Sequence, residues 1–234
     1  MKEIQQKIGI ANENWLMSAR EKLILIGLLD CLKPKKVIEF GFHRGGATKW
    51  LSQYAEKVIT VDVNEHVSNA STAFPNVQAW NCSTMDAIAR INDQKLNFDL
   101  AVVDADHSRK AVAQDVRGLL PYSEIILMHD SFNPECRKGM LDTLLTQDTH
   151  AYNLDFVPSV VKDDGLWGGI GIAWRSNSSG FVSEFAGESS PYPLIALQNL
   201  SKLSPKIHSL VTSLRSSFRV TANKLRIIAG KYFR

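Results

Sequence analysis

The densest group of side chains that could carry chemistry follows two apolar runs, FDLAVV and EIILM. Asp104 comes directly after the first run, with Asp106 and His107 just beyond it, and His129 and Asp130 follow the second. If the runs are neighbouring parallel strands, Asp104 and Asp130 meet at one sheet edge and could share a divalent cation, Mg²⁺ being the best fit. An imidazole is largely neutral at pH 7, so His107 could accept a proton from a substrate.

A second group surrounds a turn that follows the apolar run VIEF. Glu39 stands in that run, and Gly41 and Gly45 follow it before a helical stretch that contains Thr48. Glycines let the backbone turn sharply and approach a ligand, and the next helix N-terminus offers unpaired amides. The dinucleotide pattern G-x-G-x-x-G is absent, and Glu39 would repel a pyrophosphate. A ligand with an amine or sulfonium therefore fits better.

Asp62 closes the next apolar run, VITVD, about 20 residues beyond the first glycine. A carboxylate at this place can accept both hydroxyls of a ribose. A lone acid at the end of a strand can also cap a helix, so the ribose interpretation depends on the glycine turn before it.

A repeating pattern of short apolar runs and helical stretches must position these residues. The predicted strands lie at 37–40, 58–63, 77–80, 99–104 and 124–130. The predicted helices between them lie at roughly 46–55, 65–73, 84–92 and 108–118. This alternation predicts a doubly wound, Rossmann-like α/β fold with a mostly parallel sheet and a ligand site outside the carboxyl ends of its strands.

The two flanks of this pattern differ from its centre. Apolar residues at helical spacing from Trp15 to Leu32 predict a leading helix that Pro34 stops. At 154–174, DFVPSVV and GIGIAW are strand-like and turn formers separate them, which predicts a closing antiparallel hairpin. We therefore divide the sequence into a helical segment at 1–34, a ligand-binding α/β domain at 35–175, and a linker with a helical tail at 176–234.

The tail is the basic part of the sequence. After Glu188 there are eight basic residues and no acidic one, so this segment has a charge of +8. Because the net charge of the chain is +3, residues 1–188 have a charge of −5. Apolar residues from Leu203 to Phe218 recur at helical spacing between the basic ones, which predicts a basic amphipathic helix. Such a helix could lie on an anionic membrane surface, or pack on the domain or on a second copy of the chain. Nucleic-acid binding is not expected, because the body is acidic and the tail lacks a recognised motif.

The same sequence suggests a cellular location. Its longest apolar run, 23–29, is far shorter than the roughly 20 residues that cross a bilayer, and the first residues do not resemble a secretory signal. The three cysteines lie far apart and lack metal-type spacing. We therefore expect a cytoplasmic protein, which the tail could hold at the inner face of the membrane.

These residues together resemble those of class I S-adenosylmethionine-dependent methyltransferases over about residues 35–175. Glu39-x-Gly41-x-x-x-Gly45 resembles the first motif of that family, although His43 stands at its middle position instead of glycine. Asp62 resembles the ribose-binding acid, and Asn81-Cys82-Ser83 resembles the segment that lies against the adenine. More narrowly, VVDADHS followed by LMHDS resembles the branch that includes macrocin O-methyltransferase and the cephalosporin hydroxylase-like proteins.

The resemblance implies transfer of a methyl group from S-adenosylmethionine to a hydroxyl of a sugar, glycan or natural product, assisted by Mg²⁺ or another divalent cation. By matching position, Asp104 would lie at the cofactor and would bind the metal together with Asp130, with His129 beside them. His107 would be the base that takes the hydroxyl proton.

Other interpretations of the same residues stay open. Asp104-Ala-Asp106 also fits the D-x-D of a nucleotide-sugar glycosyltransferase, although the glycine turn and Asp62 argue against it. A non-catalytic nucleoside-binding protein would tolerate the loss of His107 and Asp130. In the simplest case the aspartates only cap helices and the histidines lie in surface turns.

Overall fold

The computed structural model describes residues 15–175, apart from 146, 148, 155–159 and 163–164. Seven strands form one sheet in the order β3-β2-β1-β4-β5-β9-β6, and β7 and β8 form a separate two-stranded sheet. The strands are β1 Lys36–Phe40, β2 Lys57–Asp62, β3 Val77–Asn81, β4 Phe98–Val103, β5 Ser123–His129, β6 Thr149–Asn153, β7 Val160–Lys162, β8 Gly165–Trp167 and β9 Ile170–Arg175. Strands β1 to β5 pair in parallel, whereas β9 runs antiparallel to both β5 and β6.

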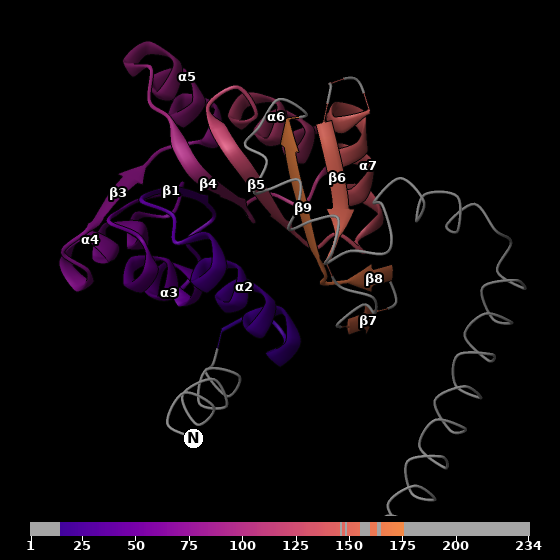
Figure 1. The fold of residues 1–234 in the computed structure, drawn as a ribbon, viewed down its shortest axis with the longest axis horizontal. Coiled ribbons are helices and arrows are strands. Elements are labelled where there is room, and N and C mark those ends of the chain that lie inside the picture. The colour runs from indigo at the N-terminus through magenta and orange to yellow at the C-terminus, as the bar shows by residue number, and fades with distance from the viewer. Residues whose placement is uncertain (1–14, 146, 148, 155–159, 163–164, 176–234) are drawn as a thin grey trace, which may run out of the picture. The chain divides into compact units, whose positions relative to one another are not determined.

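Helices cover both faces of the large sheet (Figure 1). They are α2 Ala19–Leu32, α3 Gly46–Tyr54, the 3-10 helix η1 Glu65–Ser68, α4 Asn69–Ala73, α5 Thr84–Gln94, α6 Arg109–Leu119 and α7 Pro134–Leu144. The first three α-helices lie on one side of the sheet and the last three on the other (Figure 1). The architecture is therefore the doubly wound α/β fold that the sequence predicts.

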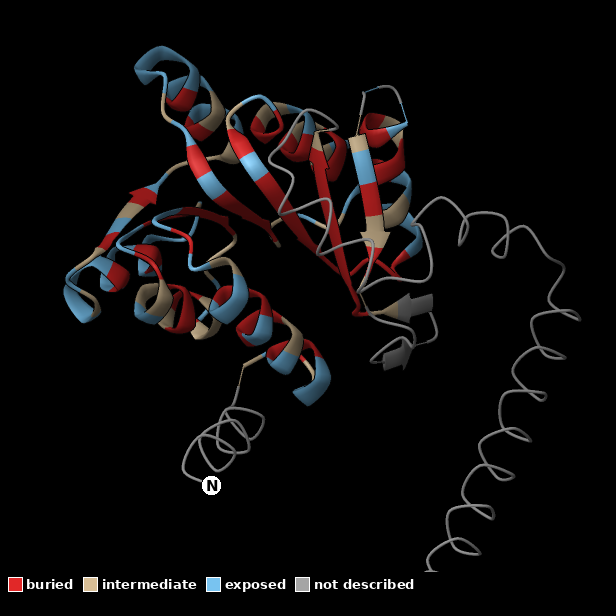
Figure 2. Cartoon of the chain, viewed as in Figure 1, coloured by how far each residue is buried: buried red, intermediate tan, exposed pale blue. Residues whose placement is uncertain are grey.

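The core lies between the sheet and these helix layers (Figure 2). Strands β1, β2 and β4 are buried almost along their whole length, as parallel strands covered on both faces must be. Leu25 and Leu29 of α2 are fully buried against the sheet in one cluster with Leu51 of α3. A capping box of Ser18 and Glu21 starts α2. The leading helix thus belongs to the core of the domain.

The central strands and helices agree with the sequence prediction to within a few residues, and the closing antiparallel strands are confirmed. Their identities differ in part. The run GIGIAW does form β9, but β9 pairs with β5 and β6 and not, as predicted, with the run DFVPSVV. Residues 160–162, at the end of DFVPSVV, instead pair with 165–167. Helix α7 and strand β6 were not predicted. The stretch predicted as one helix at 65–73 is divided into η1 and α4.

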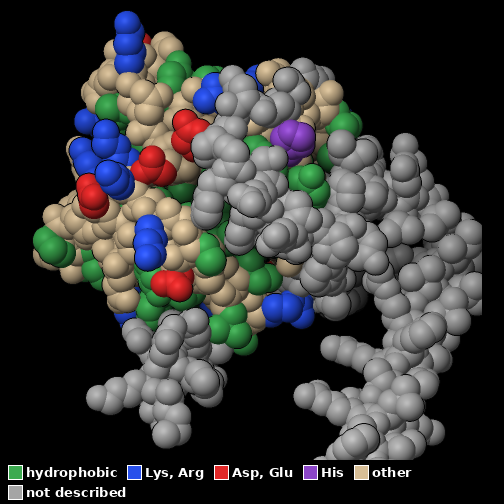
Figure 3. Space-filling view, in the orientation of Figure 1, with side chains coloured by type: hydrophobic (Ala, Val, Ile, Leu, Met, Phe, Trp, Pro, Cys, Tyr) green, Lys and Arg blue, Asp and Glu red, His purple; other side chains and the backbone are tan. Residues whose placement is uncertain are grey.

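Charged side chains are mixed on the face shown in Figure 3, where Lys and Arg lie among Asp and Glu. Where described side chains are visible on that face, the two signs are therefore interspersed. In the part of the chain that is described, no helix is long and apolar enough to span a membrane. The linker and basic tail predicted for 176–234, and most of the leading segment before Trp15, lie outside the described residues.

Candidate active site

The ends of β4 and β5 bring four ionisable side chains together. Val103 of β4 pairs with Met128 of β5, so Asp104 and His129 are the next neighbours at the sheet edge. His129 Nδ1 lies 3.0 Å from Asp104 Oδ1 and 3.5 Å from Asp130 Oδ2. His107 Nε2 lies 3.1 Å from Asp130 Oδ2 and 3.5 Å from Asp104 Oδ1. Each imidazole thus contacts both carboxylates, and the four predicted residues form one cluster.

The charges in this cluster stabilise one another. Burial alone would raise the pKa of Asp104, but attraction to His129 and hydrogen bonds from both imidazoles lower it to about 2. Burial alone would lower the pKa of His129, but its contacts with Asp104, Glu21 and Asp130 raise it well above the ordinary value. The contact with Asp104 also raises the pKa of His107. The cluster therefore favours carboxylates that face positively charged imidazoles.

The two histidines differ in their access to solvent. The side chain of His129 is 7% exposed, whereas that of His107 is 40% exposed. The indole of Trp167 packs edge to face on the His107 ring, with centroids 5.4 Å apart. His107 is thus the imidazole that an external substrate can reach, and Trp167 forms a wall beside it.

Backbone geometry fixes the direction of the Asp130 carboxylate. Asp130 is 5% exposed and adopts a left-handed conformation with φ of 55°. Its Oδ1 accepts a hydrogen bond of 2.6 Å from the Gly168 backbone N–H. The other oxygen, Oδ2, therefore remains directed at the two imidazoles.

Glu21 of α2 is a site residue that sequence reasoning missed. It is 1% exposed, and its Oε2 accepts a hydrogen bond from the Ser18 N–H within the capping box. Its Oε1 accepts a hydrogen bond from the Gly169 N–H and lies 3.7 Å from His129 Nε2. The S-x-x-E pattern is visible in the sequence and indicates the start of a helix. The contacts with Gly169 and His129 depend on the tertiary fold and leave no local signal.

The glycine turn lies directly against the Asp104 backbone. Gly41 has φ of 99°, and a Cβ on it would stand 2.1 Å from the Asp104 carbonyl oxygen. Gly45, with φ of 75°, is the N-cap of α3 and gives it no side-chain cap. The backbone N–H groups at the start of α3 therefore remain available to a ligand.

Two residues predicted for the cofactor bond with each other. Glu39 is buried, and its Oε2 accepts hydrogen bonds from Thr48 Oγ1 at 2.5 Å and Thr60 Oγ1 at 2.7 Å. Burial, which outweighs these two bonds, raises the pKa of Glu39 to about 7. Glu39 and Thr48 thus tie β1 to the first turns of α3, and their polar atoms are directed at each other.

Asp62, at the same edge of the sheet, stabilises the glycine turn and the loop that follows β2. Its Oδ2 accepts hydrogen bonds from the Phe42 N–H at 2.9 Å and the His43 N–H at 3.2 Å. Its Oδ1 accepts one from the Asn64 N–H at 2.9 Å. The contact with Asp62 holds His43 at a φ of 47°, at a position where the family motif has glycine. Asp62 is partly exposed, and a carboxylate has about four acceptor sites, so it retains room for a ribose hydroxyl.

The predicted adenine segment follows β3. Ser83 is the N-cap of α5, accepts a hydrogen bond from the Asp86 N–H and donates one to the Asp86 carboxylate. Cys82 is partly buried, and burial raises the pKa of its thiol, which therefore stays protonated at neutral pH. Ser83 thus has a capping role that the sequence did not separate from cofactor binding.

One set of side chains in the described part fits a metal ion. Ligand atoms of Asp104, His107 and Asp130 all lie within 4.8 Å of one another. Two adjacent ligands of an octahedral Mg²⁺ lie about 3 Å apart, so a small movement would complete such a site. This set contains His107, which was predicted as the base, and not His129, which was predicted beside the metal. Asp106 is exposed, its Oδ1 accepts a hydrogen bond from the Ser108 N–H, and it does not belong to this set, so the described residues do not assemble Asp104 and Asp106 as a D-x-D motif.

Comparisons with protein-family models and with curated protein sequences find no match. Solved structures do resemble the chain. An O-methyltransferase from Bacillus cereus, in complex with SAH, has a TM-score of 0.56 and 17% identity over 74% of this chain and 89% of that chain. The O-methyltransferase TomG from Streptomyces achromogenes, in complex with SAM, has a TM-score of 0.55 and 15% identity over 75% and 88%. A putative O-methyltransferase from Klebsiella pneumoniae has a TM-score of 0.54 and 18% identity over 74% and 86%.

These similarities establish the class of fold. The chain has the α/β fold of S-adenosylmethionine-dependent methyltransferases, as the motifs between Glu39 and Asp130 predict.

Proposed function

We propose that the protein is a cation-assisted O-methyltransferase that uses S-adenosylmethionine as donor. One observation carries the proposal: in a methyltransferase fold, two carboxylates and an accessible imidazole meet at the ends of β4 and β5, directly against the glycine turn. The acceptor in this proposal is a hydroxyl of a sugar, a glycan or a natural product.

The glycine turn and Asp62 support donor binding. The uncapped start of α3 offers N–H groups that suit a carboxylate such as that of the methionine moiety. Asp62 has acceptor capacity for the ribose, and Asp104 places negative charge near a sulfonium. Solved neighbours contain SAM or SAH, which agrees with this assignment.

The carboxylates support a cation beside the donor. Asp104 and Asp130 would hold it, and a bound divalent ion supplies charge that stabilises an alkoxide. In the proposed reaction the neutral form of the His107 imidazole accepts the hydroxyl proton, and Asp104 and Asp130 stabilise the imidazolium that results. Because the contact with Asp104 raises the pKa of His107, this step requires a pH at which part of the imidazole is neutral. His129 orients Asp104 from the buried side. The acceptor oxygen can then attack the methyl group in line with the sulfonium.

The surroundings of His107 support a small acceptor. The indole of Trp167 offers an apolar wall within ring-contact distance of the imidazole. TomG, one of the similar structures, is involved in tomaymycin synthesis, and this agrees with a natural-product acceptor.

The main test combines donor binding with turnover. Calorimetric titration with S-adenosylmethionine and with UDP-sugars, each with and without Mg²⁺, should show binding of the first only. Formation of S-adenosylhomocysteine from the donor, measured in the presence of each member of a panel of sugars and phenols, should then identify acceptors. His107→Ala should lower turnover by about 10²-fold or more and leave donor affinity within twofold, whereas His150→Ala on β6 should change neither. Binding of UDP-sugars alone, or equal turnover in His107→Ala, would refute the assignment.

The basic tail supports a separate proposal about location. We propose that it contacts either an anionic membrane surface or a second copy of the chain, in a cytoplasmic enzyme. Deletion of residues 190–234 should abolish sedimentation with anionic liposomes in the first case and lower the oligomer mass in the second. If neither measurement changes, the tail has neither role.

A further inference from the structure

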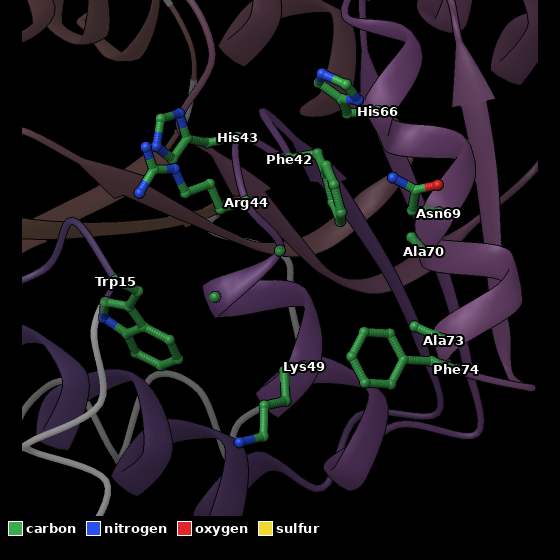
Figure 4. A pocket seen from close by; sticks show the side chains of 12 residues that line it. Trp15, Phe42, His43, Arg44, Lys49, His66, Asn69, Ala70, Ala73 and Phe74 are labelled. Carbon is green, nitrogen blue, oxygen red and sulfur yellow. The ribbon is translucent and has the colours of Figure 1, made fainter.

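A cavity lies beside the glycine turn, and no residue of the carboxylate cluster lines it. It has a volume of about 670 Å³ and lies between two groups of elements, shown in Figure 4. One group is Trp15, the turn at 42–46 and Lys49 of α3, and the other is η1 with α4. Of the residues predicted to bind the cofactor, only Gly45 lines it. The cavity therefore borders the proposed donor site at Gly45 and Gly46.

The wall of this cavity is apolar where it is most buried. Trp15, Phe42 and Phe74 contribute partly buried aromatic rings, and Ala70 between them is fully buried. Small side chains at 70 and 73 leave the space that the aromatic rings surround (Figure 4). Such a surface favours a flat, apolar body in the ligand.

The rim of the cavity is basic. His43, Arg44 and His66 are exposed, whereas Lys49 is partly exposed and its Nζ lies 5.4 Å from the centre of the Trp50 ring. The twelve residues that line the cavity include no Asp or Glu. Among the residues whose placement is described, no carboxylate lies within ion-pair distance of Arg44. This rim favours a negatively charged group, and the guanidinium of Arg44 suits the oxygens of a phosphate or carboxylate.

We infer that this cavity binds a small organic anion, with a phosphate or carboxylate at the basic rim and a ring-containing body between Trp15, Phe42 and Phe74. The inference does not depend on methyl transfer, because it uses none of the residues of the carboxylate cluster. Phe42 nevertheless belongs to the turn whose Phe42 and His43 N–H groups donate hydrogen bonds to Asp62, so the cavity adjoins the proposed donor site.

The test uses 1-naphthyl phosphate as probe and isothermal titration calorimetry on the full chain. The phosphate ester should bind at least tenfold more tightly than both 1-naphthol, which lacks the charge, and inorganic phosphate, which lacks the ring. Affinity should fall as salt increases, because charges at the rim are exposed. Equal affinity for the ester and for naphthol would overturn the inference.

Three variants locate the probe. Arg44→Glu should weaken binding about tenfold or more by reversing the charge at the rim, and Ala73→Phe should weaken it similarly by filling the cavity. Ala73 is exposed on α4, so this variant keeps the fold, which a thermal melt can check. Lys110→Glu, which makes the same kind of charge change on the exposed surface of α6, should leave affinity within twofold.

Competition separates this site from the donor site. A saturating concentration of S-adenosylhomocysteine should not displace 1-naphthyl phosphate if the two sites are distinct. Full displacement would mean that the probe occupies the donor site, and equal loss of affinity in Lys110→Glu would mean non-specific attraction. Either result would overturn the inference without affecting the methyltransferase proposal.

Discussion

The carboxyl edge of the sheet has two halves that use acidic side chains differently. At the ends of β1 and β2, Glu39 accepts two threonine hydroxyls and Asp62 accepts three backbone N–H groups. At the ends of β4 and β5, Asp104 and Asp130 face two imidazoles. In the first half the acidic side chains stabilise a turn, and in the second half they face groups that can exchange protons.

The first half of the edge therefore fixes the shape of the site, and the second half holds the groups that can react. Hydrogen bonds to neutral groups fix the glycine turn, so a donor would meet a preformed surface. Contacts between carboxylates and imidazoles leave charge that a substrate, proton or cation can alter. Changes in the second half should therefore affect catalysis more than folding, and changes in the first half should affect folding and donor binding together.

The largest effect is expected for Asp130→Asn. Asparagine tolerates the left-handed backbone at this position and retains an oxygen for the Gly168 N–H, so the fold should persist. Loss of the charge should lower turnover about 10³-fold and weaken Mg²⁺ or Mn²⁺ binding by about 10- to 100-fold. Steady-state kinetics and a metal titration measure both.

Asp142→Asn provides the matched control for that change. Asp142 lies on α7, is partly exposed and pairs with Arg109. Its variant should keep wild-type turnover and metal affinity. Wild-type activity in Asp130→Asn would show that the second half of the edge has no chemical role.

Gly41→Ala should break the first half of the comparison. The new Cβ would overlap the Asp104 carbonyl oxygen, and alanine rarely adopts a φ of 99°. We expect a loss of about 2 to 4 kcal/mol in the free energy of unfolding, together with weaker donor binding. Gly27→Ala is the control, because nothing lies within 4 Å of a Cβ there in α2, and it should stabilise the protein by about 0.5 to 1 kcal/mol. Equal stability of both variants would contradict the close approach of the turn to Asp104.

The sequence predicts the part of the fold that local patterns encode. Strands such as β4 are continuous apolar runs because both of their faces are buried, and this pattern is visible without a structure. Strand β6, with the sequence THAYN, is an edge strand of mixed polarity that pairs with β9 alone, so it lacks this signal. Helix α7 does start with a readable Asn133-Pro134 cap, but its apolar pattern is weak.

The candidate site divides in the same way. Asp104 and Asp130 could be paired in advance because adjacent strand ends meet, and this follows from topology. The contact between Glu21 and Gly169 joins residues 148 positions apart, which no local pattern encodes. The sequence also did not show that the side chains of Asp62 and Ser83 accept hydrogen bonds from backbone N–H groups. A carboxylate or hydroxyl at these positions can equally bind a ligand or cap a turn or helix.

A moderate effect is expected for Glu21→Gln. The amide keeps one oxygen for the Gly169 N–H, but it removes the negative charge that faces His129 and the second oxygen, which accepts from the Ser18 N–H. Turnover should fall about tenfold with donor affinity unchanged, because Glu21 acts through His129 and does not touch a ligand in this arrangement. Both variants lose the bond from the Ser18 N–H, at a cost of about 1 kcal/mol of stability, and Glu21→Ala also loses the acceptor for the Gly169 N–H. If Glu21→Gln changes only the melting temperature, the residue has a purely structural role.

An effect on stability alone, outside both halves of the edge, is expected for Asp115→Asn. Asp115 of α6 is 1% exposed, and burial raises its pKa to about 6 from the ordinary value of 3.8. Because the folded state prefers the protonated acid, ionisation costs stability as pH rises from about 4 to above 6, by up to about 3 kcal/mol. The asparagine variant avoids this cost, so it should be more stable than wild type at pH 8, and the difference should shrink toward pH 4. Thermal melts at both pH values measure this. A stability difference that does not depend on pH would show that Asp115 is ionised equally in the folded and unfolded states.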